Sequence, residues 1–177
     1  MRPFFVLMLM TAVLSANKDL RGFLNAYKSK DMSLACELGR KVFRSNIRDE
    51  NILIAVGQAC ASADYIDFIG VLQQRLGHSP QSRKAAVYFS TLLLKKRLIS
   101  QYMHENVDLS FYALPLTDHI LSRVYEAIKN KEFTMISKEP KHLHIGDSEN
   151  YLDLYLKEKV NVDVYEKSKK IQEHRYR

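Results

Sequence analysis

The chain is poor in residues that break regular structure and carries no motif of a known catalytic centre. Its 177 residues include only six glycines and four prolines, and it has no low-complexity stretch. This composition predicts an ordered, largely helical chain, long enough for one domain core. The motifs HExxH, CxxC and GxSxG and the glycine-rich phosphate loops are also missing. We therefore predict no catalytic residues, no cofactor and no bound metal.

The chain also lacks an apolar run of about 20 residues, the length needed to cross a bilayer. Its longest apolar run, residues 4–13, follows the single charge of Arg2 and precedes the small residues Ser15 and Ala16. A positive start, a short apolar run and a small-residue exit are typical of a secretory signal peptide. We predict a signal peptide over residues 1–16 and export to the periplasm or the extracellular space. The alternatives are a buried N-terminal helix and a retained anchor.

The chain has fewer acidic residues than basic ones, 20 against 27. The formal net charge is +7, and removal of Arg2 with the signal peptide leaves +6. The basic excess is densest in residues 83–97 and 157–177. For an exported protein this favours an acidic protein partner, an anionic bilayer surface or the cell wall over nucleic acid. The alternative is that the charge serves solubility alone.

Cysteine occurs only twice, as Cys36 and Cys60. An even number of cysteines in an oxidising compartment is compatible with a disulfide. Buried free cysteine also packs as a small hydrophobic residue, so the sequence leaves both states open.

The first hundred residues contain an internal period of 33 residues. The apolar positions Leu20, Phe23 and Tyr27 recur as Leu53, Val56 and Cys60. Their spacing is that of one helical face, and each unit reads as two amphipathic helices joined by a short polar turn. Ser45 and Asn46 end one helix, and Asp49 is expected to cap the next.

Residues 20–43 and 53–80 carry this pattern, which resembles the tetratricopeptide repeat, a helix–turn–helix unit of about 34 residues. A third, degenerate unit begins near Ser82, with a turn at residues 95–97 and a second helix at 99–107. The resemblance implies an all-α fold, a short solenoid of antiparallel helical hairpins over residues 17–109. The alternative is an irregular helical bundle with a coincidental period.

The rest of the chain is less regular. Pro115 marks a break, and residues 110–136 are expected to form a capping helix followed by an extended stretch. Residues 137–147 contain Pro140 and Gly146 and are interpreted as a linker. Residues 148–177 alternate between apolar and polar, which suits a hairpin, but they also fit two helices with a basic tail. We predict the helices and keep the hairpin as the alternative.

The resemblance also implies a peptide-binding groove lined by the first helix of each unit. The cationic and amide side chains expected on that face are Arg21, Asn25, Lys28, Gln58, Lys84 and Lys95. Such a face suits an extended acidic segment of a protein partner. The alternative is that these residues form only the solvated side of amphipathic helices.

His142 and His144, with Asp147 nearby, are the remaining candidates for chemistry. Two histidines at this spacing join a metal site only if other ligands come from elsewhere, and an exposed loop is the preferred interpretation. By analogy with the repeat family, we predict an exported protein-binding adaptor or scaffold subunit of an envelope assembly of the secretion, pilus or flagellar-motor type. The alternatives are a small envelope enzyme or metal-binding protein, and a structural subunit permanently buried in a larger complex.

Overall fold

The computed structural model describes residues 18–176, which form two compact units divided after Val87. Residues 18–87 are called the helical unit and residues 88–176 the mixed unit. The predicted signal peptide over residues 1–16 lies outside the described residues. No helix within residues 18–176 has the length and apolar character needed to span a membrane.

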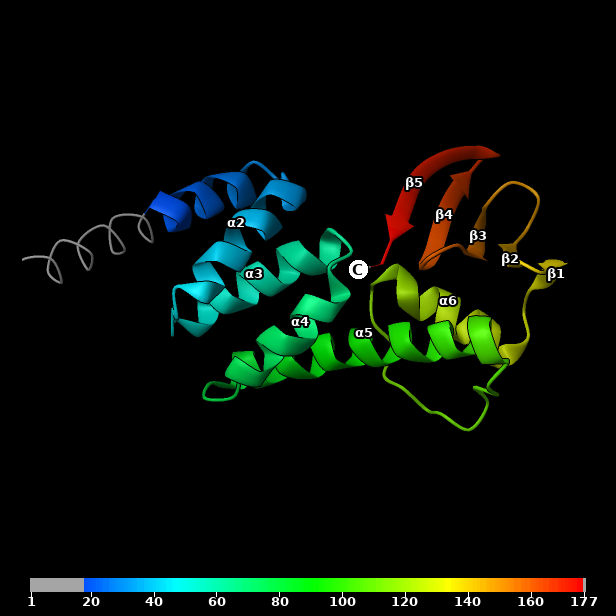
Figure 1. The fold of residues 1–177 in the computed structure, drawn as a ribbon, viewed down its shortest axis with the longest axis horizontal. Helices are drawn as coiled ribbons and strands as arrows, with labels where there is room; N and C mark the ends of the chain where they lie inside the picture. Colours follow the sequence, from blue (N-terminus) through cyan, green and yellow to red (C-terminus); the bar gives the residue numbers. More distant parts are fainter. Residues whose placement is uncertain (1–17, 177) are drawn as a thin grey trace, which may run out of the picture. The chain divides into compact units, whose positions relative to one another are not determined.

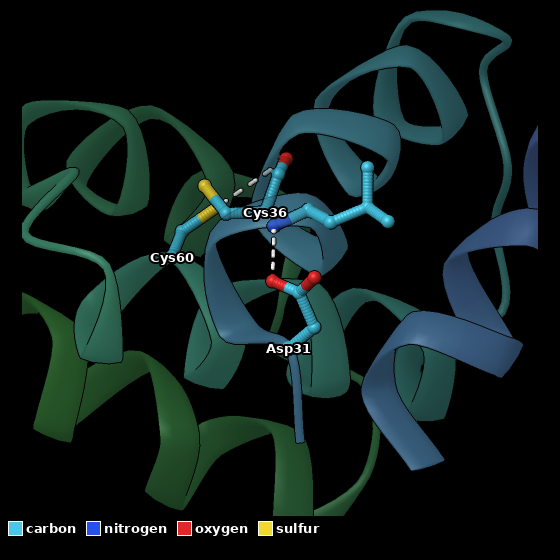
Figure 2. The surroundings of a disulfide bond; sticks show 4 residues. Asp31, Cys36 and Cys60 are labelled. Atoms are coloured by element: carbon cyan, nitrogen blue, oxygen red, sulfur yellow. Dashed lines mark hydrogen bonds between the residues drawn. A yellow bond between two sulfur atoms is a disulfide. The ribbon is translucent and has the colours of Figure 1, made fainter. Parts of the chain in front are cut away.

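The helical unit is a series of short helices capped by aspartates. A helix over residues 18–28 is followed by α2 (Met32–Arg44), α3 (Glu50–Ser62), α4 (Ile66–Leu72), the 3-10 turn η1 (Gln73–Arg75) and the start of α5 (Pro80–Glu105). The Asp49 carboxylate accepts hydrogen bonds from the amides of Asn51 at 2.9 Å and Ile52 at 3.3 Å. The predicted cap of this helix is therefore confirmed. Asp31 caps α2 in the same way, as Figure 2 shows.

α2 and α3 lie side by side and are joined covalently (Figures 1 and 2). Gly39 makes the close approach possible, because a Cβ at this position would come within 2.9 Å of the Val56 side chain. Cys36 on α2 and Cys60 on α3 are fully buried and form a disulfide. The sequence did not decide between a disulfide and two free thiols, and the structure contains the disulfide.

α5 is one uninterrupted helix of 26 residues, so the expected turn at residues 95–97 and the separate helix at 99–107 are wrong. After Pro80 this segment contains neither glycine nor proline, and nothing local ends the helix. Leu92, Lys95 and Ile99 are all buried along it. The helix begins in the helical unit and continues into the mixed unit, and a third hairpin repeat does not form.

The mixed unit contains a sheet, which corrects the all-α prediction to a fold of helices plus a five-stranded antiparallel sheet. After α5 and α6 (Ile120–Asn130), the strands follow in chain order, as Figure 1 shows. They are β1 (Thr134–Lys138), β2 (Lys141–Gly146), β3 (Tyr151–Leu156), β4 (Val160–Glu166) and β5 (Lys169–Arg175). α6 lies within the region predicted to hold a capping helix, whereas the predicted linker at residues 137–147 is mostly strand.

The alternating segment after residue 148 forms strands, so the predicted helices there are wrong. The hairpin alternative gave the correct type of secondary structure. Leu152 and Leu154 of β3 are buried and pair with Val164 and Val162 of β4. Lys167 and Ser168, both with positive φ, form the two-residue turn between β4 and β5. Such turns match the twist of antiparallel strands. Non-local pairing of apolar residues on one face therefore decides the structure.

Candidate functional site

The most unusual surface of the mixed unit is the segment between α5 and α6, residues 106–119, called the α5–α6 loop. Residues 110–117 of this loop carry no charge. Phe111 is 85% exposed, Leu116 is 75% exposed and Tyr112 is 41% exposed. Single exposed apolar residues are ordinary, but large apolar side chains gathered on one short segment are typical of interaction surfaces.

The α5–α6 loop is held at both ends. Leu109 is buried near its start. The buried Tyr125 of α6 donates its hydroxyl hydrogen to the carbonyl oxygen of Tyr112 at 2.8 Å. Near the other end, the amide of Thr117 donates to Ser122 Oγ at 3.0 Å. The exposed apolar side chains are therefore presented by an anchored backbone rather than by a slack connection.

Two carboxylates flank the uncharged part of the loop. Asp108 accepts a hydrogen bond from the amide of Ser110 at 3.0 Å, and this bond lowers the pKa of the Asp108 carboxyl. Asp118 accepts a hydrogen bond from the Tyr88 hydroxyl at 2.9 Å. Burial, together with this carboxylate, raises the pKa of Tyr88 above its ordinary value. In the sequence an acidic residue therefore lies on each side of the uncharged residues, and Lys131 lies near Asp108.

The predicted groove residues do not all lie on one unit. Arg21, Asn25 and Lys28 are exposed on the helix over residues 18–28, and Lys84 is exposed near the start of α5. Gln58 is also exposed and accepts a hydrogen bond from the Tyr27 hydroxyl at 2.7 Å. These five positions in the helical unit stay a prediction. Lys95, by contrast, lies in the mixed unit, and its side chain is fully buried.

Lys95 and Ser122 form a buried polar pair that sequence reasoning missed. The Lys95 ammonium donates to Ser122 Oγ at 2.6 Å, and burial lowers the pKa of Lys95. A lysine beside a serine is one arrangement that activates a nucleophile. Here both residues are buried, and Ser122 Oγ also lies 2.6 Å from Thr117 Oγ1. Because Ser122 is only 4% exposed and Lys95 is fully buried, we assign the pair to fold stability. The two partners are 27 positions apart in the sequence, so no local pattern indicates that they pair.

His142 and His144 lie on β2 rather than in a loop. Their ring nitrogens lie 3.5 Å and 3.1 Å from one carboxylate oxygen of Asp153 on β3. Asp147 does not join them and instead accepts amide hydrogen bonds from Glu149 and Asn150 in the β2–β3 turn. Within residues 18–176 no group of three histidine, cysteine or acidic residues is arranged to hold a metal ion. Sequence alone could not find Asp153, because the strand register brings it opposite His144.

The same sheet face carries stacked rings and paired charges. The Tyr151 and Tyr165 rings stack at 4.4 Å between centroids with an interplanar angle of 13°, so each covers a face of the other. Asp163 is bonded to the Lys170 ammonium at 2.8 Å and to Arg175 at 3.4 Å. These cross-strand contacts stabilise the sheet. Because these ring faces and charged groups already contact one another, this sheet face is poorly suited to bind a ligand.

The mixed unit also has an open cleft of about 580 Å³ between α6 and strands β1 and β2. Its lining residues carry both signs of charge, with Arg123 beside Glu126 and Glu132, and include the aromatic Phe133. This mixture of basic, acidic and aromatic side chains does not favour any one class of ligand. The α5–α6 loop therefore remains the best-defined candidate site of this unit.

Comparison with protein-family models, with curated proteins and with solved structures finds no match to this chain.

Proposed function

We propose that the chain is an exported adaptor that binds another protein through its α5–α6 loop. The observation that carries this proposal is the exposure of Phe111 and Leu116 on a backbone anchored to α6. Burial of apolar surface in a partner is favourable by roughly 25 cal/mol per Å². Aromatic side chains are enriched at the centres of protein interfaces. A rigid loop also loses little conformational freedom on binding.

The charges beside the loop favour a protein partner over a lipid surface. Asp108 and Asp118 border the uncharged residues, whereas segments that bind anionic bilayers are rich in lysine and arginine. A complementary partner has an apolar pocket with basic residues at its rim. The acidic partner segment expected for Arg21, Asn25 and Lys28 is a separate prediction for the helical unit.

Two features support export. Residues 1–16 have the pattern of a signal peptide, and the chain contains a buried disulfide between Cys36 and Cys60. Disulfides persist in oxidising compartments and are rare in the cytosol. We propose that the partner belongs to an envelope assembly, such as a secretion, pilus or flagellar-motor scaffold.

The exposed loop also suits a second candidate, a subunit held permanently in a larger complex. Such subunits expose apolar surface when isolated. Size-exclusion chromatography with light scattering separates the two candidates. A folded, soluble monomer supports the adaptor, and a chain that folds only together with its partner supports the permanent subunit.

The proposal is tested by a photo-crosslinking amino acid placed at position 111 in the native cell. The matched control position is Ile171 on β5, which is also an exposed apolar residue of the mixed unit. A discrete crosslinked protein is expected at position 111 and not at position 171. The double variant Phe111→Ser, Leu116→Ser should lose co-purification of that protein, while Ile171→Ser retains it. Absence of a product at position 111 in folded protein, or identical products at both positions, would refute the docking function.

A further inference from the structure

The helical unit has an open surface cavity of about 440 Å³, lined mainly by basic, amide and apolar side chains, of which those of Asn46, Arg48, Arg75 and His78 are exposed. Its lining residues are Asn46, Ile47, Arg48, Leu53, Arg75 and His78. They come from the α2–α3 connection, from α3, from η1 and from the segment just before α5. The volume lies within the range of small-molecule sites, roughly 300–1,000 Å³.

Arg75 is held in place before any ligand arrives. Its guanidinium carbon lies 3.8 Å from the centroid of the Phe43 ring, and its Nη1 donates to the Phe43 carbonyl oxygen at 3.0 Å. A guanidinium has five N–H donors, so this contact leaves others available. Among residues 18–176, Arg75 has no carboxylate partner. An ordered cation without an acidic partner is suited to bind an anion.

The acidic residues next to the cavity are already used by backbone amides. Glu50 accepts hydrogen bonds from the amides of Gly77 at 3.0 Å, His78 at 3.0 Å and Ser79 at 3.1 Å. The amide bonds from Gly77 and His78 are the main causes that lower the pKa of the Glu50 carboxyl to about 2. Asp49 is likewise engaged as the cap of α3. Neither carboxylate forms an ion pair with Arg48 or Arg75 within the described part of the chain.

We propose that this cavity binds a small apolar molecule carrying an oxyanion, either a carboxylate or a phosphate monoester. Arg75, oriented by Phe43, binds the oxyanion, and Arg48 and His78 supply further donors around it. Ile47, which is partly exposed, contacts the apolar part of the ligand, and the buried Leu53 packs behind it. The site is independent of the α5–α6 loop, because all of its residues belong to the helical unit.

The test is a nuclear magnetic resonance titration of the ¹⁵N-labelled protein, purified from cells under non-reducing conditions. Three probes share one alkyl chain: hexanoate, hexyl phosphate and, as the uncharged control, hexanol. Arg75→Gln and Arg48→Gln remove the proposed donors. Arg40→Gln is the matched control variant, because Arg40 also stacks on aromatic rings of this unit, 5.0 Å from the centroid of Tyr65, but does not line the cavity.

Saturable shifts at residues 46–53 and 75–79 with at least one anionic probe are expected, and the probe that binds identifies the oxyanion. Arg75→Gln should weaken this binding by about tenfold or more, as expected for a hydrogen bond to a charged group. Arg40→Gln should leave it unchanged. The proposal is overturned if neither anion binds to folded protein, if hexanol binds equally well, or if both cavity variants bind like the unmodified chain.

Discussion

Tyr125 and Tyr112 are joined by a hydrogen bond that fixes the middle of the α5–α6 loop to helix α6. The hydroxyl of the fully buried Tyr125 donates to the carbonyl oxygen of Tyr112 at 2.8 Å. The neighbouring Phe111 is the most exposed large apolar side chain among the described residues. One interior side chain therefore stabilises the conformation in which the loop presents its apolar surface.

The first prediction follows from this bond. Tyr125→Phe removes the hydroxyl and should lower the free energy of unfolding by about 1 kcal/mol. It should also increase amide hydrogen exchange in residues 109–117, because the carbonyl of Tyr112 loses its anchor. Urea unfolding and hydrogen-exchange mass spectrometry measure the two effects. Tyr151→Phe on the sheet is the control and should leave exchange in the loop unchanged. Equal exchange in both variants would show that the loop is held by other contacts.

The second prediction concerns the disulfide between α2 and α3. Cys36 and Cys60 are 24 residues apart, and a bridge over a loop of this length stabilises by about 3.5 kcal/mol on the chain-entropy description. Reduction, or the double variant Cys36→Ser, Cys60→Ser, should lower the unfolding free energy of the helical unit by about this amount. Urea unfolding with and without reductant, followed by a probe in residues 18–87, measures the change. An unchanged midpoint after complete reduction would contradict the prediction.

The third prediction concerns pH. Hydrogen bonds from the amides of Gly77 and His78 lower the pKa of Glu50 from 4.5 to about 2. A carboxyl whose pKa is lower in the folded state stabilises the fold fully above the unfolded pKa. That contribution is lost as the pH falls from about 4.5 to about 2.

The variant Glu50→Gln should therefore be less stable than the unmodified chain at pH 7. The difference should narrow between pH 4.5 and pH 2, where Glu50 itself becomes protonated. Melting temperatures of both proteins across this range measure it. Glu37→Gln is the control, because Glu37 forms only an exposed ion pair with Lys41 at 3.2 Å. If the difference in melting temperature between Glu50→Gln and the unmodified chain stays constant down to pH 2, Glu50 does not titrate as described.

The sequence predicted local features better than features that depend on pairing. The Asp49 cap and the helices α2 and α3 follow from residues close together in the chain. The strands were missed because Tyr151, Leu152, Tyr155 and Leu156 fit a helical face as well as an alternating strand. Pairing of β3 with β4, which places Leu152 opposite Val164, decides between the two. Residues near in sequence do not show that pairing.

The candidate site was missed for the same reason. Pro115 correctly indicated a break, but the exposure of Phe111 and Leu116 depends on contacts with α6 that a one-dimensional pattern does not contain. The repeat register places Lys95 on the groove face of a third helical unit, which the structure does not form. Lys95 is buried, and its ammonium donates to Ser122, which comes from another helix.

The last prediction separates the two members of this buried pair. Ser122→Ala should destabilise the mixed unit by about 1–3 kcal/mol, because it leaves the buried Lys95 ammonium without its serine acceptor. Lys95→Met should lower the free energy of unfolding by less than Ser122→Ala does, or even raise it, because it removes the buried cation together with its desolvation penalty.

The same pair should make stability depend on pH. Burial lowers the pKa of Lys95 in the folded state, so stability should rise as the pH rises from the folded pKa toward 10.5. That rise should disappear in Lys95→Met. Urea unfolding at pH 7 and at several higher pH values measures both effects. If Lys95→Met proves more destabilising than Ser122→Ala and keeps the same pH dependence, the lysine contributes through packing of its alkyl chain rather than through its charge.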